Sequence, residues 1–66
     1  MVNFELLKST IENKGMTIKS FSDQEQIDAK KFEGVGEITA SELYKICEAL
    51  KLTKQERGEI FFAPEN

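Results

Sequence analysis

Few side chains in this chain could carry out catalysis. It has no histidine and a single cysteine, Cys47. A nucleophilic cysteine needs a neighbouring base, and a free cysteine on the inner side of an amphipathic helix usually serves as a small core residue. Asp23 and Glu25 lie two positions apart, so on a helix their carboxylates point in different directions. The sequence therefore predicts no enzyme, no metal site and no cofactor.

The length and composition predict one small domain, residues 1–66. The hydrophobic fraction is 39% and includes five phenylalanines, which suffices for a compact core. With no disulfide pair and no histidine, that core must be hydrophobic or shared with a partner. No apolar run reaches the roughly 18 residues that a membrane span needs, and no basic start is followed by an apolar block. We therefore expect a soluble cytoplasmic protein with no membrane partner.

The net charge is −3, from nine Lys and Arg against twelve Asp and Glu. Phosphate is attracted chiefly by a local basic face of a protein. Because the overall charge of this chain is negative, overall electrostatic attraction alone will not bind it to DNA. We expect any DNA binding to be weak and sensitive to salt.

The clearest secondary-structure signal is a helix that begins after Thr39. Thr39 and Glu42 match a capping box, in which each side chain accepts a hydrogen bond from the other residue's amide. The apolar residues that follow recur at three- and four-residue spacing, which predicts one buried stripe and leaves Glu42 on the solvated face. The buried stripe comprises Leu43, Ile46, Ala49 and Leu50.

Similar signals predict four further helices. Their expected N-terminal caps are Asn3, Thr17, Ser22 and Thr53. Gly15 is expected to end the first helix, residues 34–36 form a glycine turn, and Pro64 ends the last helix. No alternating pattern predicts a strand. The predicted fold is all-α, a compact domain of five helices.

Several short motifs, in this order and spacing, resemble a known family. They are Gly15-Met16-Thr17, the turn ending in Gly34, Ile38-Thr39-Ala40-Ser41-Glu42, Ile46-Cys47-Glu48-Ala49-Leu50, and Glu56-Arg57 leading to Ile60-Phe61-Phe62. Together they resemble the lambda-repressor-like (XRE/Cro-type) helix-turn-helix proteins, in particular the small members carried by phages and mobile elements. The resemblance implies a helix-turn-helix domain that regulates transcription.

The middle of the chain departs from the family pattern. Phe21-Ser22 stands where a Leu-Ala pair is usual, and Gln26 stands where the sharp turn usually has glycine. The segment from Thr17 to Gly34 is about four residues short, which corresponds to one helical turn. The inward-facing residues stay in phase after such a loss, but the DNA-reading surface shrinks.

The resemblance implies that the helix after the turn, expected to begin at Ser22, enters the major groove of double-stranded DNA, with the protein acting as a homodimer. Gln24 and Gln26 would then read adenine. The expected phosphate contacts are Thr17 at a helix N-terminus and the lysines Lys19, Lys30 and Lys31.

Two observations favour other interpretations. Residues 17–36 contain three lysines against four acids, so these polar side chains are alternatively just the solvated face of two helices. The adjacent Phe61 and Phe62 cannot both be fully buried by one helix face, which leaves one of them for a partner or a second copy, unless the chain end folds back to cover it. The alternative function is an antirepressor-like or inhibitory module that binds a repressor or another host protein, and a third interpretation is a trimmed variant without a natural task.

Overall fold

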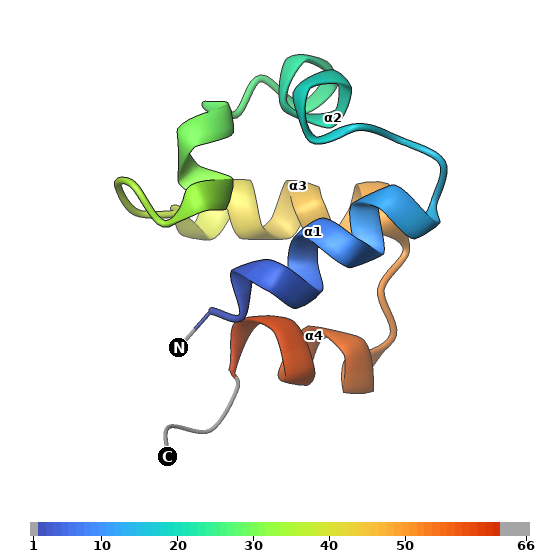
Figure 1. The fold of residues 1–66 in the computed structure, drawn as a ribbon. Helices are drawn as coiled ribbons and strands as arrows, with labels where there is room; N and C mark the ends of the chain where they lie inside the picture. Colours follow the sequence, from blue (N-terminus) through green and yellow to red (C-terminus); the bar gives the residue numbers. More distant parts are fainter. Residues whose placement is uncertain (1, 63–66) are drawn as a thin grey trace.

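The computed structural model describes residues 2–62, and within this range the chain is all-helical, with no strand. The elements are α1 (Phe4–Asn13), α2 (Ile18–Glu25), the 3₁₀ helix η1 (Ala29–Glu33), α3 (Ala40–Leu50) and α4 (Lys54–Phe61). Figure 1 shows α1 in front of α3, with α2 above and α4 below them. The all-α prediction is confirmed for these residues. The predicted five helices are instead four α-helices and one 3₁₀ helix.

Local capping signals start the α-helices at the expected places. Asn3 Oδ1 accepts a hydrogen bond from the Leu6 amide at 3.0 Å. The capping box of Thr39 and Glu42 forms with both of its hydrogen bonds, at 2.9 and 3.2 Å, and the same box forms after Thr53. Each cap satisfies amides that the first helical turn leaves without a partner. These predicted helix starts are confirmed.

The prediction that a helix begins at Ser22 is wrong. Ser22 lies inside α2, is 4% exposed, and donates its hydroxyl to the Ile18 carbonyl at 2.7 Å. The cap of α2 is Thr17, whose side chain and amide pair with Ser20. A capping residue must lie outside the helix with extended backbone, and Ser22 is already within the helix that Thr17 starts.

Gln26 ends α2 in the left-handed conformation, with φ 57° and ψ 44°. The Ile27 amide then bonds back to the Ser22 carbonyl at 3.0 Å, which closes the helix end. Asp28 caps the next element, η1, by accepting from the Lys30 amide at 2.9 Å. The sharp turn expected near Gln26 is therefore present, and only five residues of 3₁₀ helix follow it.

Replacing Gln26 by glycine is expected to stabilise the protein. A residue with a Cβ pays about 1–2 kcal/mol in the left-handed region, and glycine does not, although it loses more backbone entropy on folding. We expect a net gain of about 0.5–1 kcal/mol in the free energy of unfolding, measured by urea denaturation. Lys51 is also left-handed, at φ 52°, so Lys51→Gly should stabilise the protein by a similar amount. A loss of stability in both glycine variants would contradict this account.

The hydrophobic core draws on every helix. Its buried members are Leu7, Ile11, Phe21, Ile27, Phe32, Ile46, Cys47, Leu50, Ile60 and Phe61. The ring centroids of Phe21 and Phe32 lie 5.9 Å apart at an interplanar angle of 65°, an edge-to-face arrangement that adds to their burial. This pair holds η1 against α2. A short 3₁₀ helix has little stability of its own, so its position depends on the packing of Phe32.

No helix within residues 2–62 is both long and apolar enough to cross a membrane. The helix-ending role expected of Pro64 falls outside the described residues.

Candidate functional site

The two glutamines expected to read DNA bases lie at the end of α2 and in the turn that follows. Gln24 is in the last turn of α2, and its amide donates to the Glu25 carboxylate at 2.9 Å. Gln26 is the left-handed residue of the turn. Neither lies at the N-terminus of a helix, where a recognition helix makes its base contacts. The wrong boundary at Ser22 is the reason for this difference.

The element that follows the turn is η1, which offers little surface for reading base edges. Its five residues span about 10 Å at the rise of a 3₁₀ helix. Phe32 faces the core and Lys31 is engaged by an ion pair, so the exposed positions are Ala29, Lys30 and Glu33. Sequence-specific recognition usually depends on several polar side chains reaching the major groove.

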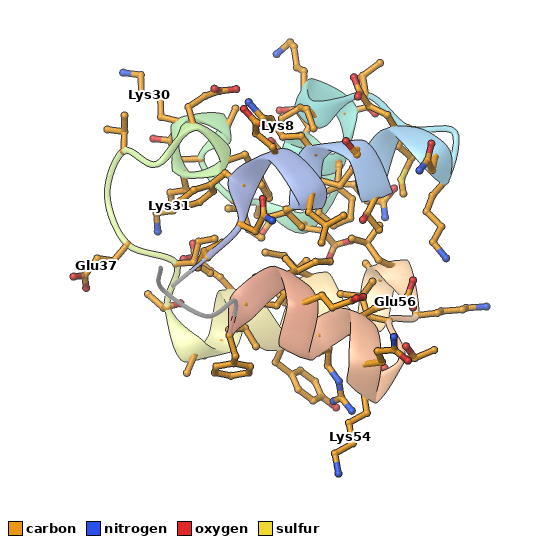
Figure 2. The ribbon with its side chains drawn as sticks, turned by 60° about the horizontal axis from the view of Figure 1, so that its bottom comes forward. Lys8, Lys30, Lys31, Glu37, Lys54 and Glu56 are labelled. Atoms are coloured by element: carbon orange, nitrogen blue, oxygen red, sulfur yellow. The ribbon has the colours of Figure 1, made fainter. Side chains whose placement is uncertain are left out.

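Most lysines on this side of the molecule form ion pairs. Lys19 lies 3.6 Å from Asp23 and Lys31 lies 2.8 Å from Glu42. Of the three lysines expected to contact phosphate, Lys30 alone has no ion pair within residues 2–62. Figure 2 shows Lys30 pointing away from the molecule. The positive charge available to phosphate on this face is small.

The ion pair between Lys31 and Glu42 joins η1 to the start of α3. Lys31 Nζ lies 2.8 and 2.9 Å from the two carboxylate oxygens, and the Thr39 amide donates to the same carboxylate at 2.9 Å. Lys31, followed by the Thr39 amide, lowers the pKa of Glu42 below its usual value. The two side chains are 23% and 16% exposed. This arrangement gives Lys31 a structural role that phosphate binding would disrupt.

The remaining expected site residues are placed as follows. Thr17 uses its hydroxyl and its amide within the α2 cap. Phe61 is buried, at 3% exposed, whereas Phe62 is 70% exposed. The structure thus separates the two phenylalanines, one into the core and one onto the surface. Figure 1 shows α4, at whose end Phe62 lies, and α2 on opposite sides of α1.

A second candidate site, which the sequence analysis missed, is an apolar groove between α3 and α4. Its volume is about 540 Å³. The residues that line it recur at three- and four-residue spacing along one face of each helix. They are Ala40, Leu43, Tyr44 and Cys47 from α3, and Lys54, Arg57, Gly58 and Phe62 from α4 and its end. Tyr44 and Phe62 are 65% and 70% exposed. We call this site the α3/α4 groove.

The chemistry of the α3/α4 groove favours binding over reaction. Burial is the main reason that the pKa of the Cys47 thiol is raised, which keeps it protonated and poorly nucleophilic. The carboxylate of Glu48, one helical turn further along α3, raises the pKa of Tyr44 because it favours the protonated hydroxyl. Lys54 and Arg57 form no ion pair within the described residues. Figure 2 shows Lys54 extending into solvent from the start of α4.

The sequence contains a signal for this groove that becomes clear only with the structure. Positions 40, 43, 44 and 47 follow the spacing of one helix face. Cys47 belongs to the buried core, as expected, and Leu43 packs against it. Tyr44, the next residue along this face, is 65% exposed, so the face is shared between the core and the groove.

Across the part of the chain that the structure describes, no three His, Cys, Asp or Glu side chains are grouped to hold a metal ion. Comparison with known proteins finds no matching family model, no matching curated protein and no matching solved structure.

Proposed function

We propose that this chain is a small protein-binding module, with the helical order of a helix-turn-helix domain, that acts through the α3/α4 groove. The observation that carries the proposal is the pair of exposed aromatic side chains, Tyr44 and Phe62, at an apolar groove of about 540 Å³. Aromatic residues are enriched among the side chains that contribute most to protein interfaces. The partner would be a repressor or another host protein, as for an antirepressor or inhibitor.

The reduced DNA-facing segment supports the same choice. A regulator that reads DNA needs a recognition helix and free cations, whereas η1 has five residues and Lys31 is paired with Glu42. The acids around η1 would repel phosphate. The groove has the opposite character, since it is apolar and carries two cations without ion pairs in the described range.

The test compares Phe62→Ala with Lys30→Ala as tagged proteins in an extract of the cells that encode the chain. We expect Phe62→Ala to weaken capture of a specific protein about tenfold, as for an interface hot spot. Lys30→Ala should leave capture unchanged. Quantitative mass spectrometry and then titration with the purified partner measure both. The proposal is wrong if no captured protein depends on Phe62, or if Lys30→Ala has the larger effect.

A second candidate is a DNA-binding transcriptional regulator of a phage or mobile element. It is favoured by the order of α2, a left-handed turn at Gln26 and η1, together with the exposed Lys30. In this case Lys30→Ala would weaken binding to the element's own double-stranded DNA uniformly across sequences and reduce the salt dependence. Fluorescence anisotropy at two or more salt concentrations, run beside the capture experiment, distinguishes the two candidates.

A further inference from the structure

We infer that the occupant of the α3/α4 groove is an acidic amphipathic helix of another protein. This inference rests on the proposed function and specifies the chemistry of the partner. Three features of the groove support it: the helical spacing of its walls, the sign of its charge, and a glycine in its lining.

The walls have the form that accepts a helix. Both consist of side chains at helical spacing, and α3 has 11 residues, a length of about 16 Å. A helix of similar length can lie along such a groove and insert apolar side chains from positions i, i+3, i+4 and i+7. The exposed rings of Tyr44 and Phe62 provide the contact area for those side chains.

The charge at the groove is opposite to that of the whole chain. Lys54 and Arg57 line it, and no acidic residue does, although the chain carries −3 overall. Glu48 does not line the groove, although its charge raises the pKa of Tyr44 and of Cys47. Acidic side chains flanking the apolar face of a partner helix would therefore find two available cations.

The same charge pattern disfavours a second copy of this chain as the occupant. A two-fold symmetric dimer places the same patch of each copy face to face. Lys54 and Arg57 would then approach their own equivalents, with no lining carboxylate to compensate. Like charges brought together at an interface oppose association.

Gly58 lines the groove and leaves space beside α4. It lies inside the eight-residue helix α4, where glycine is a poor helix former. A Cβ built at this position would have no atom within 4 Å, and the residue has no positive φ. Neither internal packing nor backbone conformation requires glycine here. The absent side chain opens the groove to an occupant.

The experiment selects binders from a display library of 16-residue helical peptides with randomised surface positions, using the wild-type chain as bait. We expect the selected pool to be enriched in Asp and Glu flanking an apolar face. Arg57→Glu should weaken the binding of a selected peptide about tenfold. A bait that carries both Arg57→Glu and Lys54→Glu should select basic peptides instead. Lys19→Glu with Lys30→Glu is the control of equal charge change and should retain the wild-type preference.

Two further measurements locate the occupant. Tyr44 is the only tyrosine in a chain without tryptophan, lines the groove and is 65% exposed, so a selected peptide without tyrosine or tryptophan should, at saturation, reduce the quenching of its fluorescence by acrylamide. Gly58→Leu fills the groove without changing its charge and should abolish peptide binding, while circular dichroism reports that the variant is folded.

Several results would overturn the inference. They are a selected pool without acidic enrichment, equal binding by Gly58→Leu, or a dimer in sedimentation equilibrium that this substitution dissociates. If Phe62-dependent capture persists while the pool is neutral or basic, the acidic-helix inference fails and the proposed function stands. If no captured protein depends on Phe62 either, both fail.

Discussion

Replacing Phe32 by alanine is expected to cost about 3–5 kcal/mol, the usual loss for a fully buried phenylalanine. Phe32 is completely buried and packs edge to face on Phe21 at 5.9 Å. A domain of this size has a total stability of roughly 3–10 kcal/mol. The substitution should therefore leave a large unfolded fraction at 25 °C, and it should detach η1 from α2. Thermal and urea denaturation followed by circular dichroism measure the effect.

The matched control is Tyr44→Ala, which removes an aromatic ring that is 65% exposed. Because that ring buries little surface within the chain, its loss should change the free energy of unfolding by less than about 0.5 kcal/mol. Equal losses for the two variants would contradict the core assigned here. A small loss for Phe32→Ala alone would show that η1 is held by other contacts.

Replacing Glu42 by alanine is expected to destabilise the protein by about 1–2 kcal/mol, the combined value of a helix cap and a partly exposed ion pair. Glu42 is the only side chain within residues 2–62 that completes a capping box and also pairs with a lysine of another element. Its loss leaves the Thr39 amide and Lys31 without their acceptor. Urea denaturation at neutral pH measures this change.

The same carboxylate predicts a dependence of stability on pH. Its pKa is lowered in the folded state, chiefly by Lys31 and then by the Thr39 amide, from a reference value of 4.5. A group with a lowered folded-state pKa stabilises the protein fully above its unfolded value and loses that contribution as the pH falls through its folded value. Stability should therefore decline below about pH 4.5, and Glu42→Ala should flatten the decline. The pKa of Glu56 is also lowered, chiefly by the Thr53 amide, so some acid sensitivity should remain.

A double-mutant cycle with Lys31→Met separates the ion pair from the cap. We expect a coupling of about 0.3–1 kcal/mol between the two positions, with the remainder of the Glu42→Ala effect belonging to the cap. Zero coupling, or an acid sensitivity that Glu42→Ala leaves unchanged, would show that Lys31 and Glu42 do not form this pair in solution.

Much of the helical framework could be predicted from the sequence, because a helix start is decided by residues close together in the chain. The caps at Asn3, Thr39 and Thr53 act over three residues and form as expected. Gly15, with φ 84°, ends the first helix as predicted. Ser22 is the exception, since the same pattern of serine followed by an acid also occurs inside a helix that has already begun.

Helix geometry also explains why only one of the adjacent Phe61 and Phe62 is buried. One helix face cannot bury both Phe61 and Phe62, and the structure buries the first and exposes the second. Which of the two faces inward depends on the register of α4 against α1. The Asn3 amide bonds to the Ile60 carbonyl at 2.6 Å across these segments, a contact that no local pattern indicates.

The sequence by itself determined an all-helical chain, the positions of most helix starts and the members of the apolar stripes, because these depend on neighbours three or four residues apart. Tertiary structure decided which surfaces remain for function. Glu42, assigned to solvent from its helix face, is engaged by Lys31 from 11 residues away, and Lys8 pairs with Glu33 across 25 residues. The α3/α4 groove exists only once the fold brings residues of α3 and α4 to the rim of one cavity. Such contacts depend on how the elements are oriented in space, which the spacing of residues within one helix does not specify.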